Sequence, residues 1–176
     1  MSKRMVRSPR AAGPALASLA LSMLLGACSA PLFRHPPPPG APLAAVVQGL
    51  GQPDAVYREP DGGQTLEYRG QPMGQFQYMA HMSPDGRLIA YEQVLTDANF
   101  AKVKVGRTTK DEILRMFGRP AEVSRVYVHD YEVWSYRYKE SGVWNSLMSV
   151  NFDQNGIVQQ MLNGPDPMYD DTRRRR

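Results

Sequence analysis

Cysteine is nearly absent from this sequence, because Cys28 is the only one among 176 residues. A single cysteine cannot form a disulfide within one chain, and alone it cannot build a cysteine-ligated metal site. Histidine is scarce too, with three residues, and none of them has the spacing of a zinc-binding helix. The sequence therefore excludes a disulfide framework, and we expect neither a metal nor another cofactor.

Long hydrophobic runs are missing as well. The longest apolar stretch ends at Leu25, shortly before Cys28, and Pro14 interrupts it. It is too short to cross a membrane comfortably, because a transmembrane helix needs about 20 apolar residues. Basic residues precede the stretch and small residues follow it, which is the order of a secretory signal. We therefore predict that residues 1–27 form a signal peptide.

The rest of the sequence lacks an excess of positive charge. The chain has 21 basic and 17 acidic residues, which gives a formal charge of +4. Four basic residues precede Cys28, and four more form the terminal run Arg173–Arg176. The part between them is mildly acidic, whereas a nucleic-acid-binding domain needs a basic patch on its folded surface. We therefore expect no nucleic-acid partner.

The cleavage region reads Leu25-Gly26-Ala27-Cys28 and resembles the lipobox of bacterial lipoproteins. The resemblance implies cleavage before Cys28, a lipid on its sulfur and acyl chains, such as palmitate, that hold the protein on a membrane. Several chains anchor stably, whereas one chain binds only marginally. Because Ser29 and not aspartate comes next, the resemblance implies the periplasmic face of the outer membrane of a Gram-negative bacterium. An ordinary signal peptide with a chance cysteine is the alternative.

Two segments have too little apolar character to join a core. Residues 28–42 contain the run Pro36–Pro39, and such runs favour an extended conformation of about 3.1 Å per residue. We predict a lipidated cysteine followed by a Pro-rich spacer there. Residues 164–176 are polar and turn-rich and end in arginines, which predicts a disordered basic tail.

The remaining sequence repeats itself. Gly51-Gln52-Pro53 is matched by Gly118-Arg119-Pro120 at a spacing of 67, and the turn residue Gly86 is matched by Gly156 at a spacing of 70. A slowly growing offset is typical of a duplicated unit with small loop insertions. We predict two tandem units, a degenerate first copy at residues 43–104 and a clearer second copy at 105–163.

The second unit contains a short helix with defined ends. Thr109 and Glu112 have the spacing of a capping box, in which each side chain binds a free backbone amide of the other residue. Phe117 lies on the apolar face, Gly118 is suited to end the helix, and Pro120 prevents its continuation. The helix is therefore expected to be only about two turns long.

Strand patterns follow this helix. Residues 123–128, 132–138 and 147–152 are β-branched, aromatic or alternating. Asn155-Gly156 is a strong turn signal, after which residues 157–162 can continue as a return strand. We predict an α+β fold in which each unit packs a short helix on a three-stranded antiparallel sheet. Trp134 is expected in the core beneath the helix.

One stretch runs from Val105-Gly106-Arg107 through the capping box to Phe117-Gly118-Arg119-Pro120, and a later strand surrounds Trp134. Together they resemble the SmpA/OmlA (BamE-like) family. The resemblance covers about residues 105–162. It implies a small outer-membrane lipoprotein that acts as an accessory protein in β-barrel assembly, with Gly106 among its motif residues. A duplicated helix–sheet arrangement is also similar to that of the β-lactamase-inhibitor proteins.

Catalytic patterns are absent. His35 lies in the spacer, His129 is followed by Asp130 at an expected hairpin tip, and the serines lack a nucleophile-elbow setting. The carboxylates lie mostly in caps and turns, where they have structural reasons to occur. We therefore predict that the protein is not an enzyme.

Binding is the remaining class of function. Tyrosine and tryptophan are enriched at interface hot spots, and Trp144, Tyr131 and Tyr127 lie at or near expected turns. We predict a protein-binding accessory role in envelope biogenesis, with an envelope protein as the partner. An inhibitor of a periplasmic enzyme and a cell-wall or lipid-binding lipoprotein are the alternatives.

Overall fold

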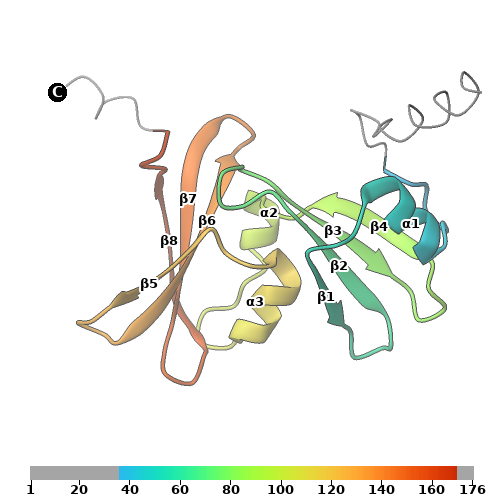
Figure 1. The fold of residues 1–176 in the computed structure, drawn as a ribbon. Coiled ribbons are helices and arrows are strands. Elements are labelled where there is room, and N and C mark those ends of the chain that lie inside the picture. The colour runs from blue at the N-terminus through green and yellow to red at the C-terminus, as the bar shows by residue number, and fades with distance from the viewer. Residues whose placement is uncertain (1–35, 170–176) are drawn as a thin grey trace, which may run out of the picture. The chain divides into compact units, whose positions relative to one another are not determined.

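The computed structural model describes residues 36–169 of the chain (Figure 1). The predicted signal peptide and the predicted lipidation at Cys28 lie outside this range. The described chain contains two units, each made of one helix and a four-stranded antiparallel meander. The first unit consists of α1 (Leu43–Leu50), β1 (Ala55–Arg58), β2 (Gln64–Arg69), β3 (Gln77–Met82) and β4 (Leu88–Gln93). After α2 (Asp97–Phe100), the second unit consists of α3 (Lys110–Phe117), β5 (Glu122–Val126), β6 (Tyr131–Glu140), β7 (Trp144–Phe152) and β8 (Val158–Pro165).

The α+β class is as predicted, but the prediction of three-stranded sheets is wrong. The strand orders are β1-β2-β3-β4 and β5-β6-β7-β8. In the first sheet, β1 has only four residues and gives little periodic signal. In the second sheet, β8 begins within the segment 157–162 that follows the Asn155-Gly156 turn and continues to Pro165. Its regular pairing with β7 makes it a full strand.

The predicted duplication extends to individual hydrogen bonds. At the start of each helix, the chain pairs with the turn that leads into the last strand of the same unit. The amide of Leu43 donates to the carbonyl of Gly86 at 3.0 Å, and the amide of Lys110 donates to the carbonyl of Gly156 at 2.7 Å. Both sheets also have a bulge at the same place, after His81 in β3 and after Asn151 in β7.

A tyrosine closes the C-terminal end of each helix in the same way. The hydroxyl of Tyr68 donates to the carbonyl of Gly51 at 3.3 Å, and that of Tyr136 donates to the carbonyl of Gly118 at 2.9 Å. The last carbonyls of a helix have no partner within the helix, so these bonds satisfy groups that would otherwise be left free. Each bond also fixes the helix to the second strand of its sheet.

Helix α3 has the predicted ends. Thr109 accepts a hydrogen bond from the amide of Glu112, and the Glu112 carboxylate accepts one from the amide of Thr109 at 2.7 Å. The hydrogen bonds that the Glu112 carboxylate accepts from the amide and the hydroxyl of Thr109 lower its pKa. Gly118 follows the helix with φ of +72°, a conformation that favours glycine. The motif residue Gly106 also has a positive φ, and its amide pairs with Val158 of β8.

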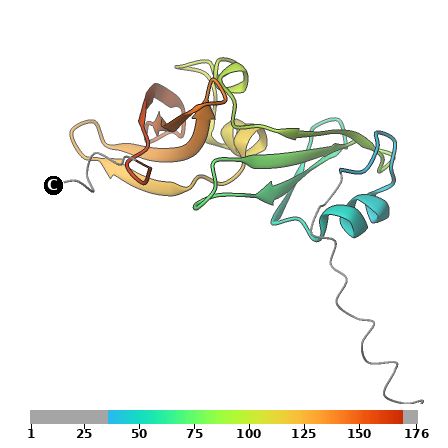
Figure 2. The ribbon, with the colours of Figure 1, turned by 90° about the horizontal axis from the view of Figure 1, so that it is seen from above.

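Two apolar clusters hold the described chain together. The smaller cluster lies between α1 and the first sheet and contains Val46, Leu50 and Leu66 (Figure 2). The larger cluster lies between α2, α3 and the second sheet, and Trp134 is 7% exposed within it, as predicted. The larger cluster also includes Met79 of β3, so the first sheet contributes to the core of the second unit.

Both predicted terminal segments are more ordered near the sheets than expected. The amide of Gly40 donates to the carbonyl of Leu88, so the end of the spacer pairs with β4. Strand β8 continues to Pro165, and Asp166 is buried in an ion pair with Arg137. In the range 36–169, no helix has the length and apolar character needed to cross a membrane.

Candidate functional site

The hairpin of β5 and β6 projects beyond the helices of the second unit, and we call residues 122–131 the arm (Figures 1 and 2). All five residues of β5 are exposed. At the tip, Tyr127 is 85% exposed and Val128 is 87% exposed. Large apolar side chains gathered on a surface mark interaction sites more often than single ones do. The arm is therefore the first candidate binding surface.

The tip of the arm is held by polar contacts. Asp130 has a φ of +53° and accepts hydrogen bonds from Arg125 at 2.7 Å and from Gln154 at 2.8 Å. The bonds from Gln154 and Arg125 lower the pKa of Asp130. The ring of His129 stacks on that of Tyr131, with centroids 5.3 Å apart. The adjacent histidine and aspartate thus have separate structural partners.

The root of the arm is a charged cluster on the sheet. Glu132 accepts hydrogen bonds from Lys110 of α3 and from the indole nitrogen of Trp134, both at 2.7 Å. These two bonds, that of Lys110 first, lower the pKa of Glu132. The Lys110 ammonium also lies 5.4 Å from the centre of the Trp134 ring. The arm is therefore tied to the helix that carries the capping box.

A second apolar surface lies at the turn between β6 and β7, and we call it the end surface. Trp144 is 69% exposed there, but it is the first residue of β7 and pairs with Glu140, whereas the sequence suggested a loop position. The hydroxyl of Tyr169 donates to the carbonyl of Met73 at 2.7 Å, which joins the chain after β8 to the β2–β3 loop. The exposed apolar residues of the end surface are Met73, Val143, Trp144, Met168 and Tyr169.

The structure separates the predicted binding residues. Tyr127 and Tyr131 lie on the arm, whereas Trp144 lies at the opposite end of β6. Sequence reasoning did not select Val123, Val126 or Val128, because β-branched residues are ordinary in a strand. Only the structure shows that these valines are exposed.

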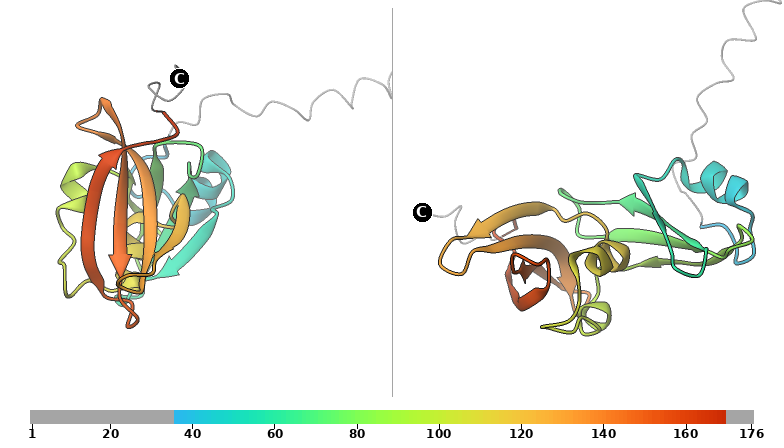
Figure 3. Two further views of the ribbon diagram at one scale, coloured as in Figure 1. Left: turned by 90° about the vertical axis from the view of Figure 1, so that its left-hand side faces the viewer. Right: turned by 90° about the horizontal axis from the view of Figure 1, so that it is seen from below.

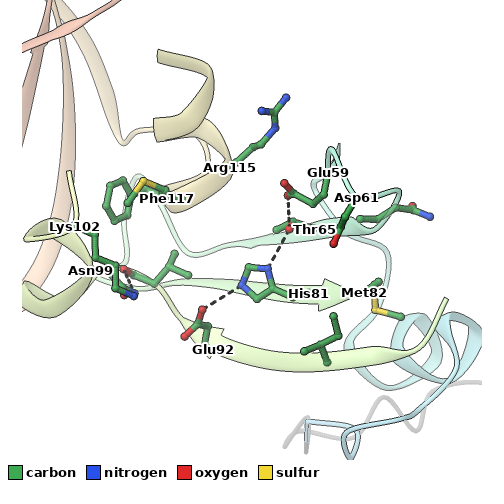
Figure 4. Close-up of a pocket in the computed structure, with 14 residues that line it drawn as sticks. Glu59, Asp61, Thr65, His81, Met82, Glu92, Asn99, Lys102, Arg115 and Phe117 are labelled. Carbon is green, nitrogen blue, oxygen red and sulfur yellow. Dashed lines mark hydrogen bonds and ion pairs between the residues drawn. The ribbon is translucent and has the colours of Figure 1, made fainter. Parts of the chain in front are cut away.

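A groove of about 390 Å³ lies between the first sheet and helices α2 and α3 (Figure 4). On the sheet, Thr65 donates to Glu59 at 2.7 Å and lies 3.1 Å from Nδ1 of His81. The other ring nitrogen of His81 lies 3.1 Å from Glu92. Both nitrogens of His81 are thus engaged by protein oxygens. In the described range, no three acidic, histidine or cysteine side chains are placed to hold a metal ion.

The face of the second sheet opposite α3 has no helix over it within residues 36–169 (Figure 3). This face of the second sheet presents Val133, Ser135 and Leu147. In the first sheet, the face opposite α1 contacts the second unit through Glu67, which accepts a hydrogen bond from Arg119. On this face Val133 and Ser135 are buried, and Leu162 of β8, which pairs with Ser149, is 50% exposed. The arm and the end surface each have several exposed apolar residues.

Comparison with protein families identifies the second unit. Residues 92–161 match the family described as the outer membrane protein assembly factor BamE domain. The predicted resemblance to the SmpA/OmlA (BamE-like) family is confirmed for this segment, which spans α2, α3 and most of the second sheet. No protein of curated function matches the sequence.

Among solved structures, a DUF4309 family protein from Bacillus subtilis matches with 13% identity and a TM-score of 0.31, over 72% of this chain and 79% of that one. A candidate β-lactamase inhibitor protein from Streptococcus mutans matches with 14% identity and a TM-score of 0.29, over 71% and 83%. A cysteine-rich secretory protein from Staphylococcus aureus matches with 16% identity and a TM-score of 0.26, over 73% and 45%. Likeness at this level says nothing about function.

Proposed function

We propose that the protein is a non-enzymatic accessory subunit that binds another envelope protein during the assembly of outer-membrane β-barrel proteins. The observation that carries this proposal is the BamE-domain match over residues 92–161. The match includes the helix and strands that form the root of the arm. The first unit then serves as a second module of the same architecture joined to this domain.

The arm and the end surface are the two docking surfaces in this proposal. Exposed tyrosine and tryptophan supply large contact area at little cost in conformational entropy, and such residues dominate binding energy at many interfaces. Tyr127 and Trp144 are the exposed aromatic residues of the two surfaces that we expect to contribute most. Trp144 is in β7 and Tyr127 is in the turn between β5 and β6, so the second sheet presents both.

A lipid anchor at Cys28 completes the proposed mechanism. Acyl chains would confine the protein to the periplasmic face of the outer membrane, and the Pro-rich segment would set its reach. Confinement raises the effective concentration of a partner in the same membrane, so a weak contact suffices for stable association. A Cys28→Ser variant should lose acyl labelling and leave the membrane fraction. Membrane retention of that variant after high-salt washing would refute the anchor.

Co-purification from solubilised membranes tests the docking role. The wild-type protein should recover subunits of the barrel-assembly machinery, and Tyr127→Ala together with Trp144→Ala should reduce the recovery by about tenfold. Ile89→Ala is the matched control, because Ile89 is an exposed apolar residue that lies in the groove and on neither surface. Recovery of the wild type without any assembly subunit would exclude this function.

A further inference from the structure

Strand β5 has one free edge. It pairs with β6 on one side and, among residues 36–169, with no strand on the other. The free edge of a sheet presents backbone N–H and C=O groups that can pair with another chain. Every residue of β5 is also exposed, with Val123 at 57% and Val126 at 39%, so side-chain area is free on both faces of this edge.

The duplication provides an internal comparison for β5. Its counterpart β1 is also an edge strand, but exposure alternates along it. Tyr57 of β1 packs against the larger apolar cluster and donates a hydrogen bond to Glu67. The first unit therefore uses one face of its edge strand for internal packing, whereas the second unit leaves both faces of β5 open.

The other edge of the second sheet is better protected. The amide of Gly106 donates to Val158 at 2.7 Å, and the amide of Val158 donates to Thr108 at 2.9 Å, so the start of β8 is paired. The strand ends at Pro165, a residue that cannot donate to a neighbouring strand. Edge strands are commonly protected by charges. In β5 the exposed Glu122 stands at the first residue, and Arg125 is tied to Asp130 within the arm, so residues 123–126 carry no free charge.

We propose that β5 is a docking edge to which an extended segment of a partner polypeptide adds as a further strand of the second sheet. Such strand addition gains affinity from main-chain hydrogen bonds and specificity from side-chain contacts. The inference rests on the proposed function only in taking the partner to be a polypeptide.

The valines of β5 define the chemistry of that segment. Val123 pairs with Trp134 and shares its face, the one turned toward α3, whereas Val126 pairs with Tyr131 and lies on the opposite face. Paired residues in a sheet point to the same face, so the added strand must offer apolar side chains on both faces. A run of consecutive apolar residues meets this need, and strict alternation of apolar and polar residues does not.

Two synthetic probe peptides test this inference on the full-length lipidated protein in detergent. One contains the run Thr-Val-Ile-Val-Val-Thr, whose four consecutive apolar residues can face Val123 and Val126 together, and the other the alternating Thr-Val-Thr-Val-Thr-Val, which cannot. Both are flanked by lysines. We expect the first peptide to slow hydrogen exchange of amides within residues 122–126 by at least about tenfold, and the second to bind about tenfold more weakly. Unchanged exchange with both peptides, or equal binding of the two, would overturn the proposal.

Matched variants and a modified peptide separate strand addition from simple apolar contact. Val123→Thr and Val126→Thr keep the branched shape and should each weaken binding by about fivefold. Val143→Thr, which changes an exposed valine of the end surface, should leave binding unchanged. Only every second N–H group of the peptide can point toward β5, so two peptides are methylated on the two alternating sets of nitrogens. The peptide whose methyl groups replace the N–H groups facing β5 should not bind. Binding of both methylated peptides would rule out a main-chain ladder.

The two proposals fail in different ways. If co-purification recovers no assembly subunits but the first peptide still protects β5, the assembly role is excluded and the docking edge stands. If co-purification succeeds and Val123→Thr with Val126→Thr leaves it unchanged, the assembly role stands and the docking edge is excluded as the contact.

Discussion

The buried carboxylate of Glu67 in β2 accepts a hydrogen bond from the backbone amide of Arg119, 3.2 Å away in the turn after α3. This bond joins the two units. Glu67 also accepts hydrogen bonds from the hydroxyl of Tyr57 and, at 2.9 Å, from the side-chain amide of Gln77. A buried carboxylate is costly unless donors surround it, and three donors here meet that need.

Glu67→Ala should lower the free energy of unfolding by about 2–3 kcal/mol, because it leaves buried donors without an acceptor. Glu67→Gln should cost less, since its carbonyl still accepts, although its NH₂ group faces other donors. Urea unfolding measures both changes. Glu92→Ala, at an exposed glutamate of the same sheet, is the control and should change little. A small effect of Glu67→Ala would mean that the inter-unit contact does not depend on this carboxylate.

Gly118→Ala should destabilise the protein by about 2–3 kcal/mol. The residue has a positive φ, and an added Cβ would lie 2.2 Å from Nε2 of Gln77 and 2.8 Å from the carboxyl carbon of Glu67. Gly142→Ala is the matched control, because Gly142 has a similar φ of +74° and open space around it. The control should cost about 1 kcal/mol in urea unfolding. If both variants lose the same free energy of unfolding, the close packing around Gly118 adds nothing to the cost of its positive φ.

Local signals made the second unit predictable. The capping box of Thr109 and Glu112 and the helix end at Gly118 depend on neighbouring residues, and all three are present as expected. Trp134 was predicted to be buried because its alternating strand fixes which side chains share a face. These features need no knowledge of how the units meet.

Contacts between distant residues were beyond the reach of the sequence. Nothing near Glu67 in the sequence predicts its burial, which depends on hydrogen bonds from Tyr57, Gln77 and the distant Arg119. The binding prediction for Tyr127 and Trp144 remains a prediction. Their separation at two ends of the sheet follows from the predicted meander, because consecutive turns lie at opposite ends of the strand that they share. Strand β8 begins within the return segment 157–162 that the sequence suggested and extends beyond it to Pro165, because its backbone pairing with β7 continues there.

Tyr136→Phe should lower the free energy of unfolding by about 1–2 kcal/mol, since it removes the buried hydrogen bond to the carbonyl of Gly118. Burial raises the pKa of Tyr136 well above its ordinary value of 10.0. The contribution of the Tyr136 hydroxyl to stability is therefore complete below its pKa in the unfolded state and declines as pH rises above that value. The variant should therefore lose less stability at alkaline pH than the wild type.

The repeat offers a matched comparison for this prediction. Tyr68→Phe removes the equivalent bond of the first unit, which is longer at 3.3 Å and only partly buried. Its cost in urea unfolding should be smaller than that of Tyr136→Phe. The reverse order would show that the shorter, buried bond of Tyr136 stabilises its helix end no more than the longer bond of Tyr68 does.

Acid should loosen the root of the arm through Glu132. Hydrogen bonds from Lys110 and Trp134 lower the pKa of this carboxyl below its ordinary value of 4.5. A carboxyl with a lower pKa in the folded state adds stability above its unfolded pKa, and this contribution is lost as pH falls through the folded pKa. Wild-type stability, followed by urea unfolding from pH ~7 to ~3, should therefore fall more steeply than that of Glu132→Gln. Glu122→Gln, at an exposed residue of β5, should follow the wild-type curve. If Glu132→Gln follows it too, the ion pair with Lys110 makes no net contribution, and the packing of Trp134 alone fixes the arm to α3.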